Sequence, residues 1–514
     1  MIAIAACAGT PGQSVAAPVV PDEFVNETVV TGLDQPIAMS RLPDGRFLVA
    51  EQRTGRIRVV LAGADTASAA LFTVPDLNIT GGERGLLGMA VDPEWPIRAY
   101  VYLLYTRTGD VMRLVRYSVW GDVVDPQSTS LLFLQPMYLF DDLPDANPNH
   151  NGGRLRFGPD GCLYASLGDD MDHCAAADST SRKGQLLRLE VRNLPAIGTG
   201  QTIAPEDLAP VGNPFPHSGP YAALVHAYGL RNPWAFHIDP ELGGLYTADV
   251  GDFYNEEIDE AAAGDFLGWP WREGWTIRSR STCPEPGFDG ANDYLGPIIQ
   301  VPHPLTTTAI VMGLMYREQL GGTANWPAEY QGLYGGLLYG EYYSGWLRLA
   351  RRQSGVWAPA AAVPGQPNAT DWGTGFYAAV DFMMEPDGGV LWLGQFDETF
   401  APASGHISRI RYAPVVDVPG AALRARVLAA APNPFRAGTE LSYALATEAD
   451  VRLELFDIAG RRVRTLENGH ASAGTHRAAW DGRDDQGIAL PAGVYLARLT
   501  RGREIETRRV MRLR

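Results

Sequence analysis

The chain has 514 residues, which is more than one hydrophobic core usually supports, so several domains or a repeat architecture are expected. Its apolar fraction of 46% is typical of a globular protein, and its 57 Gly and 38 Pro indicate frequent turns between short strands. The formal net charge of −17 argues against nucleic acid as a partner, because a phosphate backbone demands a basic surface.

The amino-terminal segment, residues 1–20, is expected to be the remnant of a signal for secretion. It is short and apolar but lacks the basic flank of a secretory signal. The run Ile4-Ala5-Ala6-Cys7 resembles a lipoprotein cleavage box in which Cys7 would carry lipid, and a chance run of small residues is the alternative. No stretch reaches the roughly 18 to 20 apolar residues that a membrane span needs. We therefore expect a secreted, cell-surface or periplasmic protein with no transmembrane span.

Residues 24–412 repeat one pattern: a Pro or Asp turn, a glycine, and then an alternating strand rich in aromatic residues. Six copies begin at Pro43, Asp92, Pro159, Asp239, Tyr330 and Pro386. The turn residues fix a bend, and the strand that follows packs an aromatic face between sheets. Strand-rich repeats without helical periodicity predict an all-β fold, a β-propeller.

Two stretches of this region stand out as candidates for chemistry. The first, Asn147 to Arg154, holds His150 between asparagines and a glycine pair just before a strand. Loops carried on a rigid scaffold are where reactive groups tend to lie, although these side chains would also suit a tight turn. The second stretch supplies a fixed cation, Arg231, and then a run of oxygen ligands from Asp249 to Asp259. The two stretches together favour a functional site.

The cysteines outside the amino-terminal segment show no CxxC spacing, so zinc binding and thioredoxin-like redox chemistry are not expected. Cys162 and Cys174 are near enough in sequence to form a disulfide in an oxidising compartment. The odd number of cysteines, with Cys283 as the third, leaves the pairing open.

The pattern changes after Tyr412. Residues 413–427 form a linker, and residues 428–514 form a second domain whose strands alternate cleanly between apolar and polar residues. With the motif Trp480-Asp481-Gly482, this domain resembles the Ig-like carboxy-terminal module that acts as a sorting signal for type IX secretion, and it also resembles Ig-like modules of the flagellar hook cap. The resemblance implies the secretion machinery as a partner, and an inert appendage is the alternative.

Several motifs of the first domain resemble, in order, those of the soluble quinoprotein sugar dehydrogenases, the glucose/sorbosone dehydrogenase family. Beside the stretches around His150 and Arg231, these motifs are Gly85-Leu86-Leu87-Gly88, Gly184-Gln185-Leu186-Leu187-Arg188 and Gly264-Asp265-Phe266-Leu267-Gly268-Trp269-Pro270. The family carries pyrroloquinoline quinone (PQQ) and calcium on a six-bladed β-propeller, and the six copies of the repeat match its six blades. The resemblance implies oxidation of an aldose sugar to its lactone, with an external electron acceptor.

The resemblance implies a role for each matching residue. His150 would be the base that takes the hydroxyl proton, because the pKa of imidazole lies near working pH. Asp169 would orient His150, with a turn-capping aspartate as the alternative. Arg231 would place a positive charge beside the quinone oxygen, and Asn232 would add a polar contact. For Arg231 the alternative is a structural ion pair. The hydride needs a cofactor as acceptor, and no Gly-x-Gly-x-x-Gly motif suggests a nicotinamide site.

Two residues near the cofactor depart from the glucose enzyme. Asn149 stands where that enzyme has Asp before the histidine, which puts base tuning and glucose specificity in question. Glu83 occupies the place of a family glutamine near the substrate, or is a turn residue. Both positions are expected to line the cofactor site.

Calcium prefers six to eight oxygen ligands, backbone carbonyls included. By resemblance, the carbonyls of Gly251 and Asp252 would bind the ion that polarises PQQ. Glu256 and Glu257 would belong to a second, structural calcium site, with a solvated acidic loop as the alternative.

One departure favours a different function. The glucose enzyme holds the PQQ carboxylates with a lysine and arginines from late blades, whereas this chain has no lysine after Lys183. Arg317, Arg348 or Arg351 would have to substitute, and spacing does not say which. The rival interpretation is a non-catalytic secreted β-propeller that binds a carbohydrate or protein ligand.

Overall fold

The computed structural model describes residues 18–278, 282–284, 294–303, 307–319, 322–327, 330, 335–414, 429–431, 435–436, 438–445, 448–457, 460–472, 474–501 and 504–513. Cys7 and most of the expected linker lie outside these residues. The described residues form antiparallel sheets and three short 3₁₀ helices, η1 (His173–Ala177), η2 (Pro205–Leu208) and η3 (Ala222–Leu224). The expected all-β fold is confirmed. None of the described helices has the length and apolar character to cross a membrane.

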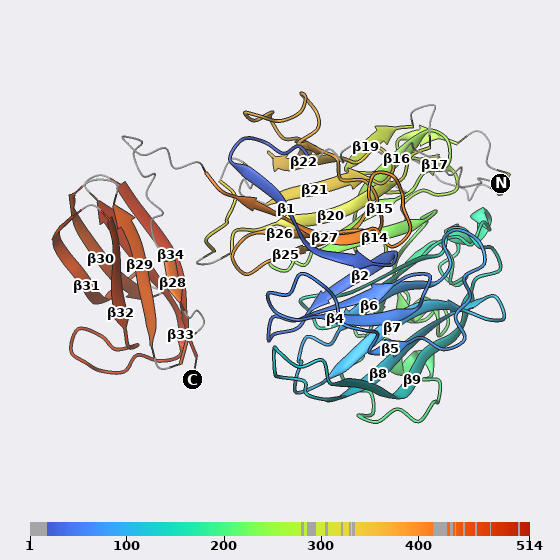
Figure 1. Ribbon diagram of the computed structural model, residues 1–514, viewed down its shortest axis with the longest axis horizontal. Coiled ribbons are helices and arrows are strands. Elements are labelled where there is room, and N and C mark those ends of the chain that lie inside the picture. The colour runs from blue at the N-terminus through green and yellow to red at the C-terminus, as the bar shows by residue number, and fades with distance from the viewer. Residues whose placement is uncertain are drawn as a thin grey trace. The chain divides into compact units, whose positions relative to one another are not determined.

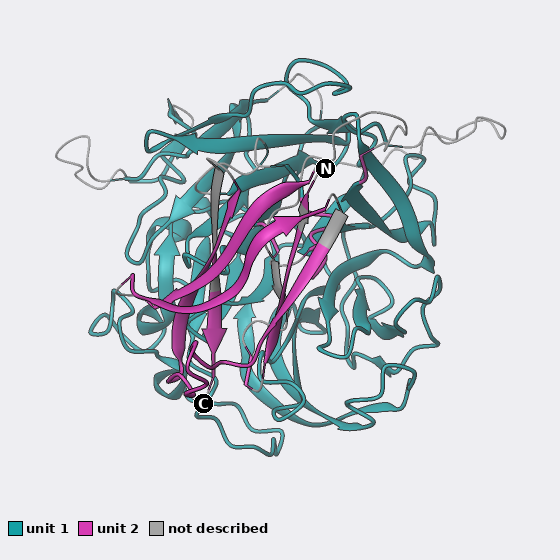
Figure 2. Ribbon diagram, turned by 90° about the vertical axis from the view of Figure 1, so that its left-hand side faces the viewer, with its two compact units in different colours: residues 1–317, 326–384, 390–412 teal, residues 318–325, 385–389, 413–514 magenta. Residues whose placement is uncertain are grey.

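The chain divides into two compact units, coloured separately in Figure 2. One contains the described residues among 1–317, 326–384 and 390–412. The other contains those among 318–325, 385–389 and 413–514. The candidate residues named above all belong to the first unit.

Six sheets of the first unit each have at least four strands, and Figure 1 shows them following one another along the chain. The first three are β2 (Pro36–Arg41), β3 (Phe47–Glu51), β4 (Arg56–Val60) and β5 (Phe72–Thr73); β6 (Leu86–Val91), β7 (Tyr100–Arg107), β8 (Val111–Gly121) and β9 (Leu131–Pro144); and β10 (Gly152–Phe157), β11 (Leu163–Leu167), β12 (Gln185–Leu189) and β13 (Val225–Tyr228).

The remaining three are β14 (Pro233–Ile238), β15 (Leu245–Asp249), β16 (Asn255–Ala261) and β19 (Ile299–Pro302); β20 (Ile310–Tyr316), β21 (Gly336–Glu341), β22 (Trp346–Gln353), β23 (Val356–Pro359) and β24 (Gly373–Thr374); and β25 (Ala379–Met384), β26 (Val390–Gly394), β27 (Gly405–Tyr412) and β1 (Phe24–Leu33). A small hairpin, β17 (Arg272–Glu273) and β18 (Thr276–Ile277), forms a two-stranded sheet of its own.

The first strands of the six sheets contact one another in sequence. β2 contacts β6, β6 contacts β10, β10 contacts β14, β14 contacts β20, β20 contacts β25, and β25 contacts β2. Apolar clusters fill the space between neighbouring sheets, as in the cluster that joins Leu155 of β10 to Leu104 of β7. The repeated turn-and-strand pattern of the sequence therefore corresponds to successive sheets that bury their faces against each other.

The sixth sheet joins the two ends of this unit. β1, from its start, pairs antiparallel with β27, and the blue and orange strands lie side by side in Figure 1. Phe24 of β1 packs edge-on against Trp326 and Trp372 with ring centroids 5.1 Å apart in both cases. Edge-on aromatic pairs of this kind contribute about 0.5 to 1.5 kcal/mol beyond the area they bury.

A buried arginine links three of the sheets. The guanidinium of Arg154, on β10, donates to the carbonyl oxygen of Ile37 on β2 at 3.0 Å and to that of Val380 on β25. It also lies 3.4 Å from the carboxylate of Asp381, which accepts a hydrogen bond from the backbone N–H of Met39. A buried cation needs such partners to offset its desolvation, so Arg154 fixes the spacing of β2, β10 and β25.

The same irregularity occurs near the start of five first strands. The register with the second strand shifts between Pro36 and Ala38, Leu86 and Gly88, Gly152 and Leu155, Pro233 and Ala235, and Ala379 and Asp381. Bulges bend a strand and redirect its side chains. The loops that precede these strands carry Glu83, His150, Arg231 and Asn232, so the candidate residues gather at one end of the sheets.

The second unit is a small β-sandwich. One sheet contains β28 (Ala429–Ala431), β29 (Thr439–Leu445) and β32 (Gly474–Trp480), and the other contains β30 (Ala449–Asp457), β31 (Arg462–Ala471), β33 (Gly493–Arg501) and β34 (Glu504–Arg512). The alternation predicted for β30 buries Val451, Leu453 and Leu455 in a core with Trp480 and Tyr495. This unit therefore has its own hydrophobic core.

Candidate functional site

The loop before β10 holds His150 in a left-handed backbone conformation, with φ of 62°. This conformation is uncommon for a residue other than glycine, and strained backbone of this kind tends to cluster at functional sites. Gly152 follows, also at positive φ, and Gly168 lies against the loop so closely that a Cβ there would be 1.9 Å from the carbonyl oxygen of His150. The glycines of the motif are thus required by the tight path that presents His150.

Asp169 accepts hydrogen bonds from several groups around His150. Its Oδ1 receives the Nδ1 of His150 at 2.7 Å and the backbone N–H of Met171 at 2.8 Å. Its Oδ2 receives the Nδ1 of His173 at 2.6 Å and the indole N–H of Trp269 at 2.9 Å. Burial opposes ionisation of this carboxyl, yet the hydrogen bonds and charges of the two histidines lower its pKa below the usual value. Asp169 is therefore an anion that orients both imidazoles.

The tautomer of His150 follows from this arrangement. Since an ionised carboxylate only accepts hydrogen bonds, Nδ1 of His150 carries the proton. Its Nε2 makes no hydrogen bond with any residue that the structure describes, and the residue is 6% exposed. A neutral imidazole with Nε2 available is the form that can accept a proton.

Glu83 connects the His150 loop to the Arg231 loop. One of its carboxylate oxygens accepts hydrogen bonds from the backbone N–H of His150 at 2.8 Å and of Asn151 at 3.3 Å, and from the side-chain amide of Asn232 at 3.2 Å. The amide oxygen of Asn232 accepts the N–H of Gly152 at 3.1 Å. These contacts hold the two sequence motifs in one site, although they are 80 residues apart.

Asn149 does not join this network. Its side chain is exposed, and its amide donates at 3.4 Å to the side-chain oxygen of Asn147. The backbone N–H of Asn149 donates to the same oxygen, as in a local turn. The structure therefore brings Glu83, His150, Asp169 and Asn232 together and leaves the side chain of Asn149 outside their contacts.

Arg231 is held from three sides. Its backbone N–H donates to Asp249 at 2.8 Å, its Nη1 donates to the carbonyl oxygen of Val250 at 2.8 Å, and its Nη2 lies 3.6 Å from the carboxylate of Asp252. The guanidinium stands 5.6 Å from the ring centroid of Trp269, the residue that also donates to Asp169. Its buried Nε has no hydrogen-bond partner within the described residues.

A second cation, Arg278, accompanies Arg231. Its Nη2 donates to Asp252 at 2.6 Å, and its guanidinium lies 4.4 Å from the ring centroid of Trp269. Although burial opposes ionisation, the two arginines lower the pKa of Asp252. The Nε of Arg278 is also buried without a partner among the described residues. The pair therefore leaves two buried N–H donors available to an anionic ligand.

The loop between β15 and β16 is shaped by Glu273 of β17. One oxygen of this buried carboxylate accepts the N–H groups of four consecutive residues, Asp252 to Asn255, at 2.6 to 3.1 Å. Because the N–H groups turn toward Glu273, the chain around them is fixed in a tight arc. The carbonyl oxygens of Gly251 and Asp252 accept no hydrogen bond from the described residues. Oxygens of this kind suit a calcium ion.

Glu256 and Glu257 are not brought together. They are neighbours in the regular part of β16, so their side chains leave opposite faces of the sheet. Glu256 accepts the N–H groups of Gly251 and Ile310 and lies 2.7 Å from His303, whose pKa it raises against the effect of burial. Both glutamates are buried, so they do not form a solvated acidic loop.

Glu257 lies among other carboxylates on the opposite face. It accepts the N–H of Gly274 at 2.7 Å, and burial, together with the charges of Asp259 and Asp249, raises its pKa well above the usual value. Both carboxylate oxygens of Asp259 are buried without a hydrogen-bond partner in the described region. This face therefore gathers more carboxyl groups than its described neighbours supply with hydrogen-bond donors.

His150, Asp169 and His173 also come close enough to be considered as metal ligands, with one ligand atom from each within 4.8 Å of the others. Their hydrogen bonds argue for another role. Each oxygen of Asp169 already receives two donors, and each Nδ1 carries the proton that it donates. A metal ion that took Asp169 as a ligand would have to compete with these four donors. We therefore interpret the cluster as a hydrogen-bonded network.

His173, Trp269, Glu273 and Arg278 are the site residues that the sequence did not single out. His173 lies four residues after Asp169, and Trp269 lies inside a family motif, so those two positions carried a signal. Glu273 acts on backbone N–H groups, and Arg278 follows a short hairpin. No side-chain motif would have marked either of them.

The disulfide of the structure differs from the pair considered in the sequence. Cys174 of η1 is bonded to Cys283, whereas Cys162 is free and buried. Cys162 precedes β11 and Cys174 follows it, so the two are kept at opposite ends of a strand. Five extended residues span roughly 16 Å, and a disulfide needs Cα atoms about 4.4 to 6.8 Å apart. The disulfide fixes the segment that carries His173.

Two of the three late arginines, Arg317 and Arg348, are engaged elsewhere. Arg317 pairs with Asp239, which follows β14, whereas Arg231 precedes that strand. Arg348 pairs with Asp371 at 2.7 Å and lies 3.9 Å from the ring centroid of Trp346. Arg351 is half-buried on β22. None of these arginines forms an ion pair with a residue of the site, within the described parts of the chain.

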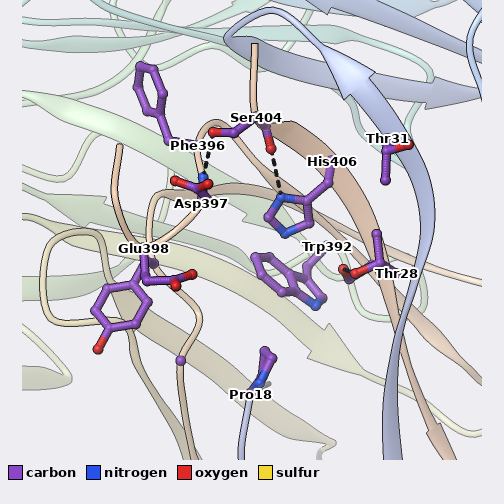
Figure 3. Close-up of a pocket in the computed structure, with 12 residues that line it drawn as sticks. Pro18, Thr28, Thr31, Trp392, Phe396, Asp397, Glu398, Ser404 and His406 are labelled. Atoms are coloured by element: carbon purple, nitrogen blue, oxygen red, sulfur yellow. Dashed lines mark hydrogen bonds between the residues drawn. The ribbon is translucent and has the colours of Figure 1, made fainter. Parts of the chain in front are cut away.

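A pocket of about 210 Å³ lies beside the sixth sheet and contains none of the candidate residues. Figure 3 shows His406 and Trp392 within it, with Asp397 and Ser404 at one side. Asp397 is committed to its own loop, where it accepts hydrogen bonds from Thr399 and Ala401. The pocket is therefore separate from the site around His150.

The sequence was compared with known families and proteins. Residues 33–297 match the family described as glucose / sorbosone dehydrogenase, and residues 433–503 match the FlgD Ig-like domain. An aldose sugar dehydrogenase of Escherichia coli is 30% identical over 245 residues, which are 48% of this chain and 61% of that protein. Human Hedgehog-interacting protein is 29% identical over 240 residues, or 42% of this chain and 32% of that protein. These alignments span less than two thirds of either relative.

Solved structures show the same fold. The PQQ-bound aldose sugar dehydrogenase of Streptomyces coelicolor has a TM-score of 0.54 and 22% identity, with 76% of this chain and 99% of that chain covered. The soluble aldose sugar dehydrogenase of Escherichia coli in its apo form has a TM-score of 0.56 and 20% identity over the same shares. At these identities the likeness concerns the fold.

Proposed function

Because the chain belongs to the glucose/sorbosone dehydrogenase family, we propose that it is a PQQ- and calcium-dependent dehydrogenase that oxidises an aldose sugar at the anomeric carbon to the lactone. The observation that carries this proposal is the hydrogen bond of 2.7 Å between Nδ1 of His150 and Asp169. It leaves Nε2 available as a base, and Trp269 connects this network to the two arginines, because its N–H donates to Asp169 and both guanidinium groups lie near its ring. An external acceptor would then remove the electrons.

The scaffold proposed for this activity is a closed six-bladed β-propeller formed by residues 24–412. The contacts of each first strand with the next, and of β25 with β2, support closure. The pairing of β1 with β27 supports a last blade completed by the amino-terminal strand. We propose residues 413–427 as the linker and residues 428–514 as the Ig-like domain.

The proton steps follow from the network around His150. Nε2 of His150 takes the proton of the anomeric hydroxyl, while Nδ1–H keeps its hydrogen bond to Asp169. The negative charge of Asp169 stabilises the imidazolium that results. Glu83 holds the backbone of His150 and the amide of Asn232, so the base keeps its place relative to the Arg231 loop. A positioned base of this kind contributes about 10² to 10⁴-fold to the rate.

PQQ, when bound, would accept the hydride from the anomeric carbon, so that the sugar loses two electrons and a carbonyl forms. The residues present fit an anionic quinone of this type, since Arg231 and Arg278 each have a buried Nε without a partner in the described region. Arg231 would supply the positive charge beside the quinone oxygen, with Asn232 and Glu83 nearby. Arg278 is our candidate for the cation that the absent late lysine would otherwise provide.

Calcium is proposed at the loop between β15 and β16. The carbonyl oxygens of Gly251 and Asp252 accept no hydrogen bond from described residues, as expected for ligands of the ion beside the quinone. Glu256 and Glu257 remain our candidates for structural calcium binding. Because they lie on opposite faces of β16, we propose that they do not share one ion.

Spectroscopic titration tests the function. PQQ is added to the protein with calcium, and a saturable change in quinone absorbance at one PQQ per chain is expected, followed by bleaching when an aldose is added. Arg231→Met should lower the affinity for PQQ by about 10²-fold or more, because it removes a positive charge from a poorly solvated site. Arg192→Met, a half-exposed arginine that pairs with Glu190, is the matched control and should change nothing.

A second candidate is a non-catalytic propeller that binds a carbohydrate or protein. The similarity to human Hedgehog-interacting protein favours it, as does the position of the late arginines outside the site. The same titration separates the two functions. Absence of saturable PQQ binding, with normal folding, would support the binding module and reject the dehydrogenase.

We propose a secreted, periplasmic or cell-surface location. The disulfide between Cys174 and Cys283 supports an oxidising compartment. The Ig-like domain is proposed as a sorting signal for type IX secretion, with the secretion machinery as partner. Lipid attachment at Cys7 belongs to the same proposal. Deleting residues 428–514 should leave PQQ binding intact and stop export; export without this domain would refute the sorting role.

A further inference from the structure

Two imidazoles share one buried carboxylate at the centre of the site. Nδ1 of His150 and Nδ1 of His173 lie 2.7 Å and 2.6 Å from different oxygens of Asp169. The ring centroids of the two histidines are 6.2 Å apart. His173 therefore has a direct hydrogen-bonded connection to the proposed base through a single residue.

The two histidines differ in their access to solvent. The side chain of His150 is 7% exposed, whereas that of His173 is 28% exposed. Trp269 fixes His173 from the side, because its ring is edge-on at 5.1 Å and its N–H donates to the same oxygen of Asp169. The disulfide of Cys174 ties the next residue to a distant segment. The position of His173 is thus built into the fold.

Other charged groups face this pair from each neighbouring loop. Glu83 accepts a hydrogen bond from the backbone of His150, and the Asp252 carboxylate lies between Arg231 and Arg278, with a pKa that these arginines and His173 lower. On the loop of His173 itself, Lys183 pairs with Asp170 and Asp172. Apart from His150, His173 is the only one of these groups whose side chain is hydrogen-bonded to Asp169. A change in the charge of His173 therefore acts directly on the carboxylate that orients His150.

We propose that His173 is a positioning residue that holds Asp169 and shares its negative charge, so that the protonation of one imidazole disfavours protonation of the other. A proton on His173 would be attracted by Asp169 and would repel a proton on His150. His150 would then stay neutral, and able to act as a base, to a lower pH than with Asp169 alone. The consequence for catalysis rests on the proposed function, whereas the link between the two histidines does not.

Histidine ring NMR tests this link without cofactor or substrate. In the unmodified protein both imidazoles should titrate over a broad range, since interacting groups release protons in shared steps. His173→Gln keeps a donor to Asp169 and removes the charge, so His150 should titrate in one step with its midpoint raised by about 0.5 to 1 pH unit. His150→Gln should raise the midpoint of His173 by the same amount, because coupling is reciprocal.

His217→Gln is the control, since His217 is exposed and makes no contact with the site. It should change neither titration. The proposal is overturned if the titration midpoint of His150 is unchanged in His173→Gln. It is equally overturned if the midpoint of His173 is unchanged in His150→Gln.

Kinetics provide a second readout. The acidic limb of kcat/KM should move to higher pH in His173→Gln by the shift seen for His150, with KM little changed. His173→Ala should lower kcat by about tenfold or more, since misplacement of a catalytic group by about 1 Å can cost on the order of 10²-fold. Equal losses in the two variants would contradict the proposed role of the hydrogen bond. A protein that never oxidises sugar would refute the proposed function, while the NMR result would stand.

Discussion

Asp169 and Glu273 are two buried carboxylates that organise opposite sides of the site in different ways. Asp169 accepts four donors, three of which are side chains: His150, His173 and Trp269. Glu273 also accepts four donors, and all of them are backbone N–H groups of the loop from Asp252 to Asn255. The first carboxylate orients reactive side chains, and the second shapes a loop in which the carbonyl oxygens of Gly251 and Asp252 accept no hydrogen bond from the described residues.

This difference determines how substitutions should act. On the Asp169 side the chemistry belongs to particular side chains, so changes there should remove activity. On the Glu273 side the proposed ligands are carbonyl oxygens, which every residue possesses, so activity should depend on the shape of the loop. Stability and calcium binding should respond before the chemistry does.

The largest effect is expected for His150→Ala. If His150 is the base, turnover with an aldose should fall by about 10²-fold or more, while PQQ binding changes little, because the base acts mainly in the transition state. Steady-state kinetics after reconstitution with PQQ and calcium measure this, with His217→Ala as the control. Unchanged turnover would show that the Asp169 side does not carry the base.

The next largest effect concerns the disulfide that holds the His173 end of the Asp169 network. Cys174→Ser with Cys283→Ser opens a link between residues 109 positions apart, and the free energy of unfolding should fall by about 2 to 5 kcal/mol. Equilibrium unfolding in urea measures the change. Cys162→Ala, at the free buried cysteine, should have a smaller effect. Equal stability of the double variant and the parent would mean that the link leaves the unfolded chain unconstrained.

Much of the Asp169 side could be predicted from the sequence, because its residues belong to long motifs. The stretches around His150 and Arg231 indicated a site, and the repeated turn-and-strand pattern indicated the all-β fold. What the motifs could not give is the distance between them. That distance depends on Glu83, which joins the two loops through backbone N–H groups, and on bulges that recur near the start of the first strands.

The Glu273 side was harder to predict. The sequence pointed to Glu256 and Glu257 as a pair, but neighbouring residues of a strand face opposite ways. Glu273 lies in a two-residue strand with no periodic signal, and its partners are backbone groups that every sequence contains. The pairing of Cys174 with Cys283 likewise depends on which loops meet in space, which spacing along the chain does not give.

A smaller effect is expected for Glu273→Ala, which removes the acceptor of four N–H groups. Leaving buried donors without partners costs about 1 to 3 kcal/mol each, and water reaching this loop would offset part of that cost. We expect a loss of about 2 kcal/mol in the free energy of unfolding and weaker calcium binding. Urea unfolding and calcium calorimetry measure both. Glu273→Gln keeps one acceptor oxygen and should lose less. An unchanged calcium affinity in Glu273→Ala would show that the loop does not form the calcium site.

The smallest expected effect is a difference between the two sides in how stability depends on pH. The pKa of Asp169 is lowered in the fold, so its contribution to stability is present at neutral pH and is lost only as the pH falls below about 4. The pKa of Glu257, beside the Glu273 loop, is raised by burial and by Asp259. Its ionisation therefore costs stability as the pH rises above about 4.3, its value in the unfolded chain.

Glu257→Gln removes this cost, so in the presence of a chelator it should raise the melting temperature at pH 8 by about 1 to 2 °C. The gain should shrink as the pH is lowered toward 5, where the parent carboxyl is protonated in the fold. Adding calcium should reverse the difference if Glu257 is a ligand, because the ion then stabilises the parent protein more than the variant. Scanning calorimetry at several pH values, with Glu206→Gln as an exposed control outside the site, measures each step. A gain that is independent of pH would show that Glu257 is ionised in the fold throughout, and a difference insensitive to calcium would exclude Glu257 from the calcium site.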